Sequence, residues 1–178
     1  MSFEETKILA KGKYLGLYLE GTWEFAERPN SHGCVGILPI TDDGHLVLIG
    51  QYRIPMQAKV IEIPAGLTGD EEEFSHESLV ESAARELSEE TGYRAGVITH
   101  LLSSPTSAGM VREMTHLYAA TSLVKETEGG GTEDESITVY NVPLDQLNDF
   151  LSEKEKSGYL IDFKIHASLL IAQQKGII

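Results

Sequence analysis

The sequence predicts an α+β fold: an α/β/α sandwich in which helices cover both faces of a mixed β-sheet, with additional antiparallel strands at the N-terminus. Two observations support this. Short apolar runs separated by turn residues lie on both sides of one segment whose apolar spacing changes from two to nearly four residues. Two further helical segments close the chain. Strands, an internal helix, more strands and closing helices are typical of such a layered fold.

The composition predicts one domain and a small-molecule partner. A chain of 178 residues that is 41% hydrophobic is long enough for one well-formed core and too short for two independent ones. We predict that residues 1–32 form N-terminal strands of the domain whose main body is 33–178. The formal charge of -14 argues against a nucleic-acid partner, because such binding needs clusters of Lys and Arg. An anionic small molecule stays possible if a metal ion neutralises its site.

The expected cellular location is the cytoplasm. The single Cys34 cannot form an intramolecular disulfide, so nothing in the chain calls for an oxidising compartment. The sequence shows no signal-like apolar N-terminus and no run of some 18 apolar residues, so we expect no membrane association.

The first half of the chain is predicted to form strands. Residues 6–28 contain apolar segments that Gly12 and Gly21 separate, which indicates short strands, the last of them at Trp23–Glu27. Two longer apolar runs flank the turn sequence Asp42-Asp43-Gly44, which is typical of a β-hairpin. The two runs are Cys34–Ile40 and His45–Tyr52. A further strand is predicted after them at Val60–Ile63, which ends at Pro64-Ala65-Gly66.

The first helix follows this strand end. Val80, Ala83, Ala84 and Leu87 form an apolar stripe at helical spacing, and Gly92 supplies the stop signal. The remaining elements are predicted from the same signals. They are strands at Gly96–Leu102, His116–Ser122 and Ile137–Val142, a helix at Leu144–Lys156 opened by Pro143, and a helix at Phe163–Lys175 capped by Asp162.

Two long irregular stretches, Thr68–Ser75 and Lys125–Ser136, are both acidic. The second contains Gly129-Gly130-Gly131 followed by Glu133-Asp134-Glu135. We expect it to be a mobile loop that brings a carboxylate towards a site.

Three carboxylates on the first helix, Glu86, Glu89 and Glu90, indicate a metal site. Residues three or four apart share a helix face, and Glu86 and Glu90 lie about 40° apart around the axis. Two carboxylates about 4 Å apart repel each other by roughly 1 kcal/mol in water and more in a protein, so a divalent ion between them is expected. Hard oxygen ligands favour Mg²⁺ or Mn²⁺. A solvated face with weak ion pairs is the alternative interpretation.

The helix sequence resembles the Nudix box, G-x5-E-x7-R-E-U-x-E-E-x-G-U, in which U is a bulky apolar residue. The match is complete from Glu77 through Arg85 and Leu87 to Gly92 and Tyr93. Upstream, ten residues instead of five separate Gly66 from Glu77, which indicates a five-residue insertion before the helix. Gly69 is the alternative box glycine, with a two-residue insertion. We expect the insertion to lengthen a surface loop without displacing the carboxylates.

Motifs elsewhere are similar to one branch of the Nudix family, the ADP-ribose and nucleoside diphosphate sugar pyrophosphatases. Members of that branch are homodimers whose N-terminal strands contribute to the partner's site. The similarity covers most of the chain and lies in five motifs. They are Trp23-Glu24 with Arg28, Gln51-Tyr52-Arg53, Glu62-Ile63-Pro64-Ala65-Gly66, Ser107-Ala108-Gly109 with Glu113, and Glu133-Asp134-Glu135.

The resemblance implies roles for individual residues. Glu86, Glu89, Glu90 and the backbone carbonyl of Ala65 resemble the ligands of two or more Mg²⁺ ions, for which Mn²⁺ can substitute. Either Glu133 or Glu135 resembles the general base. Arg85 lies one turn from Glu89 and is expected to be a fixed countercharge that holds the carboxylates in place, and both residues are counted among the candidate catalytic residues.

The resemblance also implies a substrate site. Arg53 resembles a residue that binds phosphate, and Arg28 and Glu62 belong to the matching motifs. Glu113 resembles a residue near the terminal sugar or the metal. Trp23 resembles an aromatic residue that stacks on the nucleobase, although as the single Trp it could equally be a buried anchor.

The implied reaction is metal-assisted hydrolysis of a nucleoside diphosphate sugar, such as ADP-ribose, ADP-glucose or GDP-mannose, to a nucleoside monophosphate and a sugar phosphate. Two alternatives stay open. One is a non-catalytic sensor of nucleotide sugars, and the other is a nucleoside triphosphate pyrophosphohydrolase.

Overall fold

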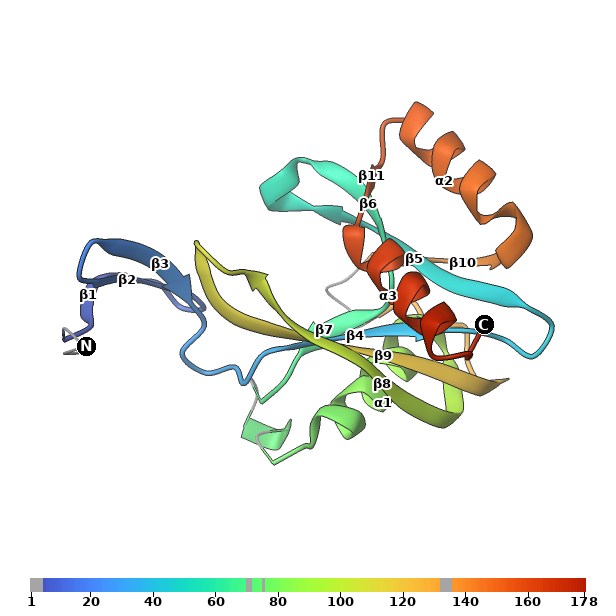
Figure 1. The fold of residues 1–178 in the computed structure, drawn as a ribbon, viewed down its shortest axis with the longest axis horizontal. Helices are drawn as coiled ribbons and strands as arrows, with labels where there is room; N and C mark the ends of the chain where they lie inside the picture. The colour runs from blue at the N-terminus through green and yellow to red at the C-terminus, as the bar shows by residue number, and fades with distance from the viewer. Residues whose placement is uncertain (1–4, 70–71, 75, 132–135) are drawn as a thin grey trace.

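The computed structural model describes residues 5–69, 72–74, 76–131 and 136–178. Figure 1 shows the arrangement of its elements. The strands are β1 Lys7–Lys11, β2 Gly16–Glu20, β3 Trp23–Glu27, β4 Cys34–Pro39, β5 His45–Arg53, β6 Ala58–Glu62, β7 Ala65–Leu67, β8 Tyr93–Ser107, β9 Val111–Lys125, β10 Thr138–Pro143 and β11 Leu160–Ile161. The α-helices are α1 Leu79–Thr91, α2 Leu147–Lys156 and α3 Phe163–Gln174. Short 3-10 turns lie at Ile54–Met56, Glu72–Phe74 and Leu144–Gln146.

The α+β class is confirmed, but the strands form two sheets instead of one. The larger sheet has the order β1-β2-β3-β9-β4-β7, with β8 paired to β9, and the smaller has the order β10-β5-β6-β11. Both are mixed: β4 and β9 are parallel within an otherwise largely antiparallel sheet, and β11 is parallel to β6.

The predicted hairpin between Cys34–Ile40 and His45–Tyr52 is wrong. The turn forms, with the Gly44 N–H donating to the Thr41 carbonyl at 3.0 Å. The two strands then diverge into different sheets, and only an isolated bridge between Ile40 and Leu46 joins them. Both strands are buried almost throughout, so each can pair with distant strands on either side. An apolar run next to a turn does not determine with which other strand it pairs.

The predicted element boundaries also differ from the structure. The segments predicted at Gly96–Leu102 and His116–Ser122 are the central parts of two 15-residue strands, β8 and β9, whose ends are largely exposed and polar. The two shortest strands, β7 and β11, were not predicted. The first turn of the predicted helix at Leu144 is a 3-10 turn. The Asp162 cap is confirmed, since its Oδ1 accepts the backbone N–H of Lys164 at 2.7 Å.

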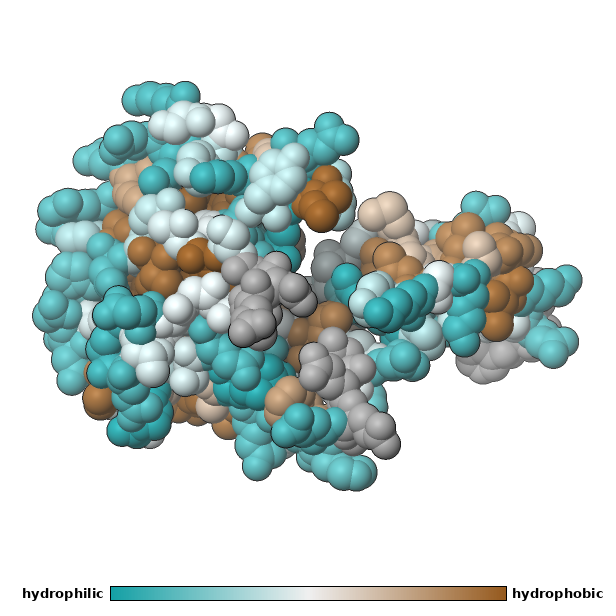
Figure 2. All heavy atoms as spheres, turned by 180° about the vertical axis from the view of Figure 1, so that it is seen from behind, coloured by the Kyte–Doolittle hydropathy of each residue, from teal (hydrophilic) through white to brown (hydrophobic). Residues whose placement is uncertain are grey.

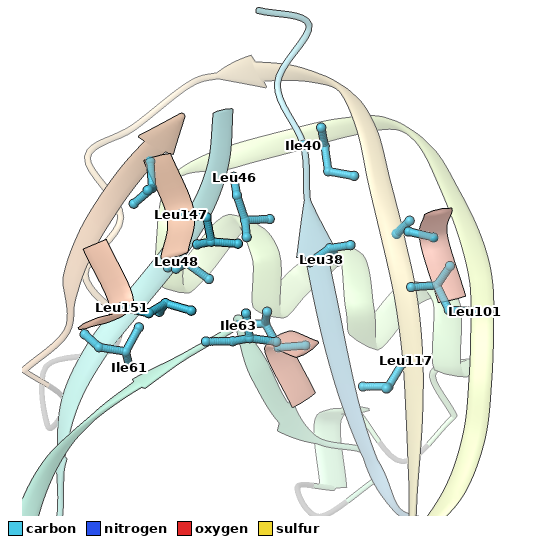
Figure 3. Packing of buried hydrophobic residues seen from close by; sticks show 14 residues of the cluster. Leu38, Ile40, Leu46, Leu48, Ile61, Ile63, Leu101, Leu117, Leu147 and Leu151 are labelled. Carbon is cyan, nitrogen blue, oxygen red and sulfur yellow. The ribbon is translucent and has the colours of Figure 1, made fainter. Parts of the chain in front are cut away.

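Successive side chains along the central strands of the larger sheet point to opposite faces, and different helices cover these two faces. Val35 and Ile37 of β4 pack with Ala83 and Leu87 of α1. The other face belongs to a larger cluster that joins both sheets to α2 and α3 (Figure 3). Its labelled members are Leu38, Ile40, Leu46, Leu48, Ile61, Ile63, Leu101, Leu117, Leu147 and Leu151. Helix α1 is therefore fixed against one sheet face by Ala83 and Leu87, and its carboxylates lie outside this cluster. Val80 and Ala84, predicted to belong to the same apolar stripe, are exposed instead.

The ends of α1 are well defined by local hydrogen bonds. Ser78 and Glu81 form a capping box, in which the Ser78 side chain accepts the Glu81 N–H and the Glu81 carboxylate accepts the Ser78 N–H. Gly92 ends the helix in the left-handed conformation, with φ 73°. Within the described parts of the chain, no helix has the length and apolar character needed to cross a membrane.

Strands β1 to β3 form an N-terminal arm that extends away from the main body (Figure 1). The arm joins the larger sheet through β3 and β9, where Ala26 pairs with Val111 and its N–H donates to the Met110 carbonyl at 2.9 Å. Hydrophobic residues cover much of its surface in Figure 2. The large exposed apolar side chains of the arm are Ile8, Leu9, Tyr14, Leu15, Leu17 and Trp23.

Candidate active site

A polar cleft of about 700 Å³ lies where the acidic face of α1 meets the strand end at β7 and the first residues of α3. Strand β7 brings Ala65 and Gly66 to the cleft, because it pairs with β4 at the edge of the larger sheet. The lining residues come from eight parts of the chain. They are Arg28, Cys34, Arg53, Ala65, Gly66, Leu67, Glu73, Phe74, Arg85, Glu86, Glu89, Glu113 and Lys164.

The carboxylate of Glu86 lies against the backbone of Gly66. A Cβ atom at position 66 would lie 2.0 Å from the Glu86 carboxylate carbon and 2.0 Å from one of its oxygens. No side chain fits there unless Glu86 moves. The requirement for glycine thus comes from this close approach, which identifies Gly66, rather than Gly69, as the glycine opposite the acidic helix. The alternative alignment with Gly69 places the glycine next to His32 instead.

Glu90 is almost completely buried, with 3% of its surface exposed. Its Oε2 accepts the backbone N–H of Ala65 at 2.9 Å. Glu86 and Glu90 therefore share one side of α1, as the helical spacing predicted, and that side faces the strand end at residues 65 and 66. A buried carboxylate is costly unless it is paired or binds a cation.

Arg85 is held among three carboxylates. Its Nη1 donates to Glu86 at 2.9 Å and to Glu89 at 3.0 Å, and its Nε donates to Glu77 at 3.2 Å. The guanidinium also lies over the ring of Phe74, 4.3 Å from the centroid. Burial lowers the pKa of Arg85, but the neighbouring charges of Glu86 and Glu77 outweigh it and raise the pKa above its ordinary value. Arg85 is thus a permanent cation that orients the acidic residues.

These acidic residues have the chemistry of a site for a hard divalent ion. The carboxylates of Glu86 and Glu89 both accept hydrogen bonds from Arg85 Nη1, and Glu90 is buried beside them. Carboxylate oxygens are ligands that hard divalent ions prefer. Across the described ranges, no three His, Cys, Asp or Glu side chains are grouped closely enough to hold an ion as they stand. An ion would compete with Arg85 for Glu86 and Glu89. The donor set fits a metal, provided that these side chains adjust.

Two ion pairs border the carboxylates. Arg53 forms a two-pronged pair with the buried Glu62, at 2.8 Å from Nε and 3.1 Å from Nη2. Burial lowers the pKa of Arg53, but its hydrogen bonds to Glu62 outweigh the effect and the net pKa is raised. Arg28 pairs through Nη1 with Glu113. Of these four residues, Arg28, Arg53 and Glu113 line the cleft, so the structure brings them together with the acidic helix.

Trp23 is not part of the acidic cleft. Its side chain is 64% exposed and lines a separate cavity of about 290 Å³ between the arm and the turn from β8 to β9. The interpretation of Trp23 as a buried anchor is therefore wrong. Arg112 borders the same cavity and stacks on Phe25, 4.2 Å from the ring centroid. An exposed aromatic side chain on such a wall is available for stacking.

The late acidic loop, which follows β9, is hydrogen-bonded to the C-terminal end of α1. The N–H of Gly130 donates to the Glu90 carbonyl at 2.9 Å, and the N–H of Gly131 donates to the Glu89 carbonyl at 3.1 Å. Two of the three glycines predicted to be part of a mobile loop, Gly130 and Gly131, thus bind the C-terminal end of α1. The candidate bases Glu133 and Glu135 lie outside the described residues.

Five cleft residues were not found from the sequence: Cys34, Leu67, Glu73, Phe74 and Lys164. The insertion before α1 does more than lengthen a surface loop, because Phe74 packs on Arg85. For Phe74, the sequence contained one signal, which was an aromatic residue within an acidic stretch. The thiol of Cys34 is unreactive, since burial raises its pKa to about 12. Lys164 is discussed below.

Comparisons with known proteins agree with this geometry. A family model described as NUDIX domain matches residues 30–163. The ADP-ribose pyrophosphatase of Bacillus subtilis is 32% identical over 192 residues, covering 96% of this chain and 98% of that protein. A GDP-mannose pyrophosphatase of Cronobacter sakazakii is 32% identical over 162 residues, covering 86% of this chain and 78% of that protein. A crystal structure of an ADP compounds hydrolase shares the fold, with a TM-score of 0.76 at 22% identity, covering 97% of this chain and 92% of that one.

Proposed function

Because the chain belongs to the Nudix domain family, we propose that it hydrolyses the diphosphate linkage of nucleoside diphosphate sugars in a Mg²⁺-dependent reaction. The observation that carries the proposal is the packing of the α1 carboxylates against the strand end, with Glu86 filling the space beside Gly66 and Glu90 bonded to Ala65. Relatives named for ADP-ribose and GDP-mannose support the substrate class. The products are a nucleoside monophosphate and a sugar phosphate.

The acidic residues are the proposed metal ligands. Glu86, Glu89, Glu90 and the carbonyl of Ala65 hold two or more Mg²⁺ ions, or Mn²⁺ in their place. When bound, these ions supply charge neutralisation of the diphosphate and make a water molecule more acidic. Arg85 keeps Glu86 and Glu89 in position through its hydrogen bonds.

The remaining residues bind the substrate and move a proton. Arg53 and Arg28 bind phosphate oxygens, because a guanidinium can hold two such oxygens at once. Glu133 or Glu135 takes the proton of the attacking water. As the new bond from oxygen to phosphorus forms, the bond from that phosphorus to the bridging oxygen breaks, and the leaving phosphate keeps the electron pair. Trp23 stacks on the nucleobase.

A substrate panel tests the proposed reaction. The protein is incubated with Mg²⁺ and ADP-ribose, ADP-glucose or GDP-mannose, and a phosphatase that acts only on the monoester products releases inorganic phosphate. We expect release from at least one nucleotide sugar and none when EDTA is present. Release from nucleoside triphosphates alone would replace the proposal with the triphosphate alternative. Binding of a nucleotide sugar without release would indicate a sensor.

We also propose that the chain is a homodimer in which the arm contacts the partner. The support is the exposed apolar surface of β1 to β3, since isolated soluble chains rarely expose a continuous apolar patch of this kind. The change Ile8→Asp together with Leu17→Asp is expected to convert the dimer to a monomer, because it places charges on that surface. Light scattering measures the mass, with Ile178→Asp, an exposed apolar site at the other end, as the control. A monomeric unaltered protein contradicts the proposal.

A further inference from the structure

The short pairing of β11 with β6 places the start of α3 at the cleft. Leu160 pairs with Val60 and Ile161 with Ile61 in parallel register. The next residue, Asp162, donates its N–H to the Ile61 carbonyl at 2.9 Å. The chain therefore enters α3 beside the end of β6, where Glu62 holds Arg53. Lys164, in the first turn of α3, lines the cleft as a result.

The ammonium group of Lys164 is held in a defined position. Asp162 binds this residue twice: Oδ1 accepts the backbone N–H at 2.7 Å, and Oδ2 pairs with Nζ. The Lys164 side chain is 16% exposed, which is low for a lysine. A surface lysine would sample many rotamers, and most of that freedom is already lost here. The group is thus preorganised to bind an anion at little further entropic cost.

Among the described contacts, Lys164 is bound by fewer carboxylate oxygens than Arg85 or Arg53. Arg85 is bound by three carboxylates, and Arg53 forms a two-pronged pair with Glu62. An ammonium group has three N–H donors, and among the described residues one carboxylate oxygen, Asp162 Oδ2, accepts from Lys164. Two donors are therefore available for other acceptors in the cleft.

The partly exposed thiol of Cys34 lines the cleft and is affected by the charged residues around it. After burial, the largest influence on the pKa of this thiol is the lowering effect of Lys164, followed by the effects of Glu113, Arg28 and Glu86. Cys34, Lys164 and these three residues line the same cleft. A diphosphate bound in that cleft would therefore lie in the space that Lys164 borders.

We propose that Lys164 is a substrate-binding residue whose ammonium group donates hydrogen bonds to phosphate oxygens of the diphosphate. The inference rests on the proposed function, since it assigns a further contact to the same substrate. Asp162 is its positioning residue. The carboxylate orients the ammonium group and, through its second oxygen, stays bound to the helix backbone when Nζ turns towards the phosphate.

Neutral replacements of Lys164 test this contact. Lys164→Met keeps the length of the side chain and removes the charge, and we expect it to raise the KM for ADP-ribose about 10- to 100-fold, as the loss of a charged hydrogen bond implies. Lys164→Arg keeps the charge and is expected to recover much of this loss. Lys156→Met removes the same charge from an exposed position on α2 and is expected to leave the KM unchanged.

A binding measurement separates this inference from the proposed function. Calorimetry with methylene diphosphonate and Mg²⁺ reports diphosphate binding without turnover, and Lys164→Met is expected to raise its Kd by a similar factor. If Lys164→Met does not fold, as judged by its thermal transition, Lys164→Gln takes its place with the same expectation.

The outcomes are distinct. If the unaltered protein hydrolyses nucleotide sugars and the neutral variants keep KM and Kd within about twofold, the role of Lys164 is wrong and the proposed function stands. If the unaltered protein binds the diphosphonate, loses that binding with Lys164→Met and hydrolyses no nucleotide sugar, the inference stands and the proposed function fails. Absence of both binding and turnover in the unaltered protein overturns both.

Discussion

Replacing Glu90 by Gln is expected to lower kcat/KM for the preferred nucleotide sugar by at least about 100-fold at saturating Mg²⁺, because even partners of metal ligands cost 10- to 100-fold when removed. Glutamine has nearly the same shape as glutamate, and its amide oxygen can still accept the Ala65 N–H that Glu90 accepts at 2.9 Å. What is lost is the negative charge at a site that is 3% exposed. Steady-state kinetics across Mg²⁺ concentrations measures the loss.

The matched control is Glu155→Gln, which removes one carboxylate from an exposed position on α2. It is expected to keep full activity. The thermal transition of Glu90→Gln is expected to stay near that of the unaltered protein, since a buried charge is replaced by a neutral group that keeps the hydrogen bond. Normal turnover by Glu90→Gln would remove Glu90 from the metal site.

Gly66→Ala is expected to lower kcat/KM about 10- to 100-fold while changing stability by less than about 1 kcal/mol. The new methyl group would occupy the place of the Glu86 carboxylate, since a Cβ there lies 2.0 Å from it. The obstructing atoms are the end of a flexible side chain, so the fold can accommodate alanine by moving Glu86. The carboxylate is then displaced from the strand end. Kinetics and thermal unfolding, measured on the same samples, separate the two effects.

A double-mutant cycle shows whether Gly66 acts through Glu86. Glu86→Ala removes the displaced carboxylate, so adding Gly66→Ala to it should cause little further loss of activity. If the two changes instead multiply, the methyl group interferes with something else at the strand end. A loss of stability that accounts for the whole loss of activity would also contradict the explanation.

The features that the sequence predicted correctly are local ones. The burial of Ala83 and Leu87, the stop of α1 at Gly92 and the side shared by Glu86 and Glu90 follow from helical periodicity, which depends only on nearby residues. The Asp162 cap is local in the same way. Within the described residues, these elements supply the acidic face of the site.

The features that the sequence did not predict depend on long-range pairing. The separation of β4 and β5 into two sheets depends on partners about 80 to 100 residues further along the chain, in β9 and β10. Lys164 reaches the cleft because β11, a strand of two residues, pairs with β6. So short a strand has no detectable period. Phe74 could not be placed over Arg85, because an insertion has no regular structure from which to infer its direction.

The direction of α3 determines where the molecule can be modified. This helix starts at the cleft with Lys164 and ends near the C-terminus, and its 12 residues span about 18 Å (Figure 1). A fluorescent label or immobilisation linker attached after Ile178 would therefore be carried away from the cleft. The same label at the N-terminus would lie beside the apolar arm. For surface-based binding measurements, the C-terminal end is the better point of attachment.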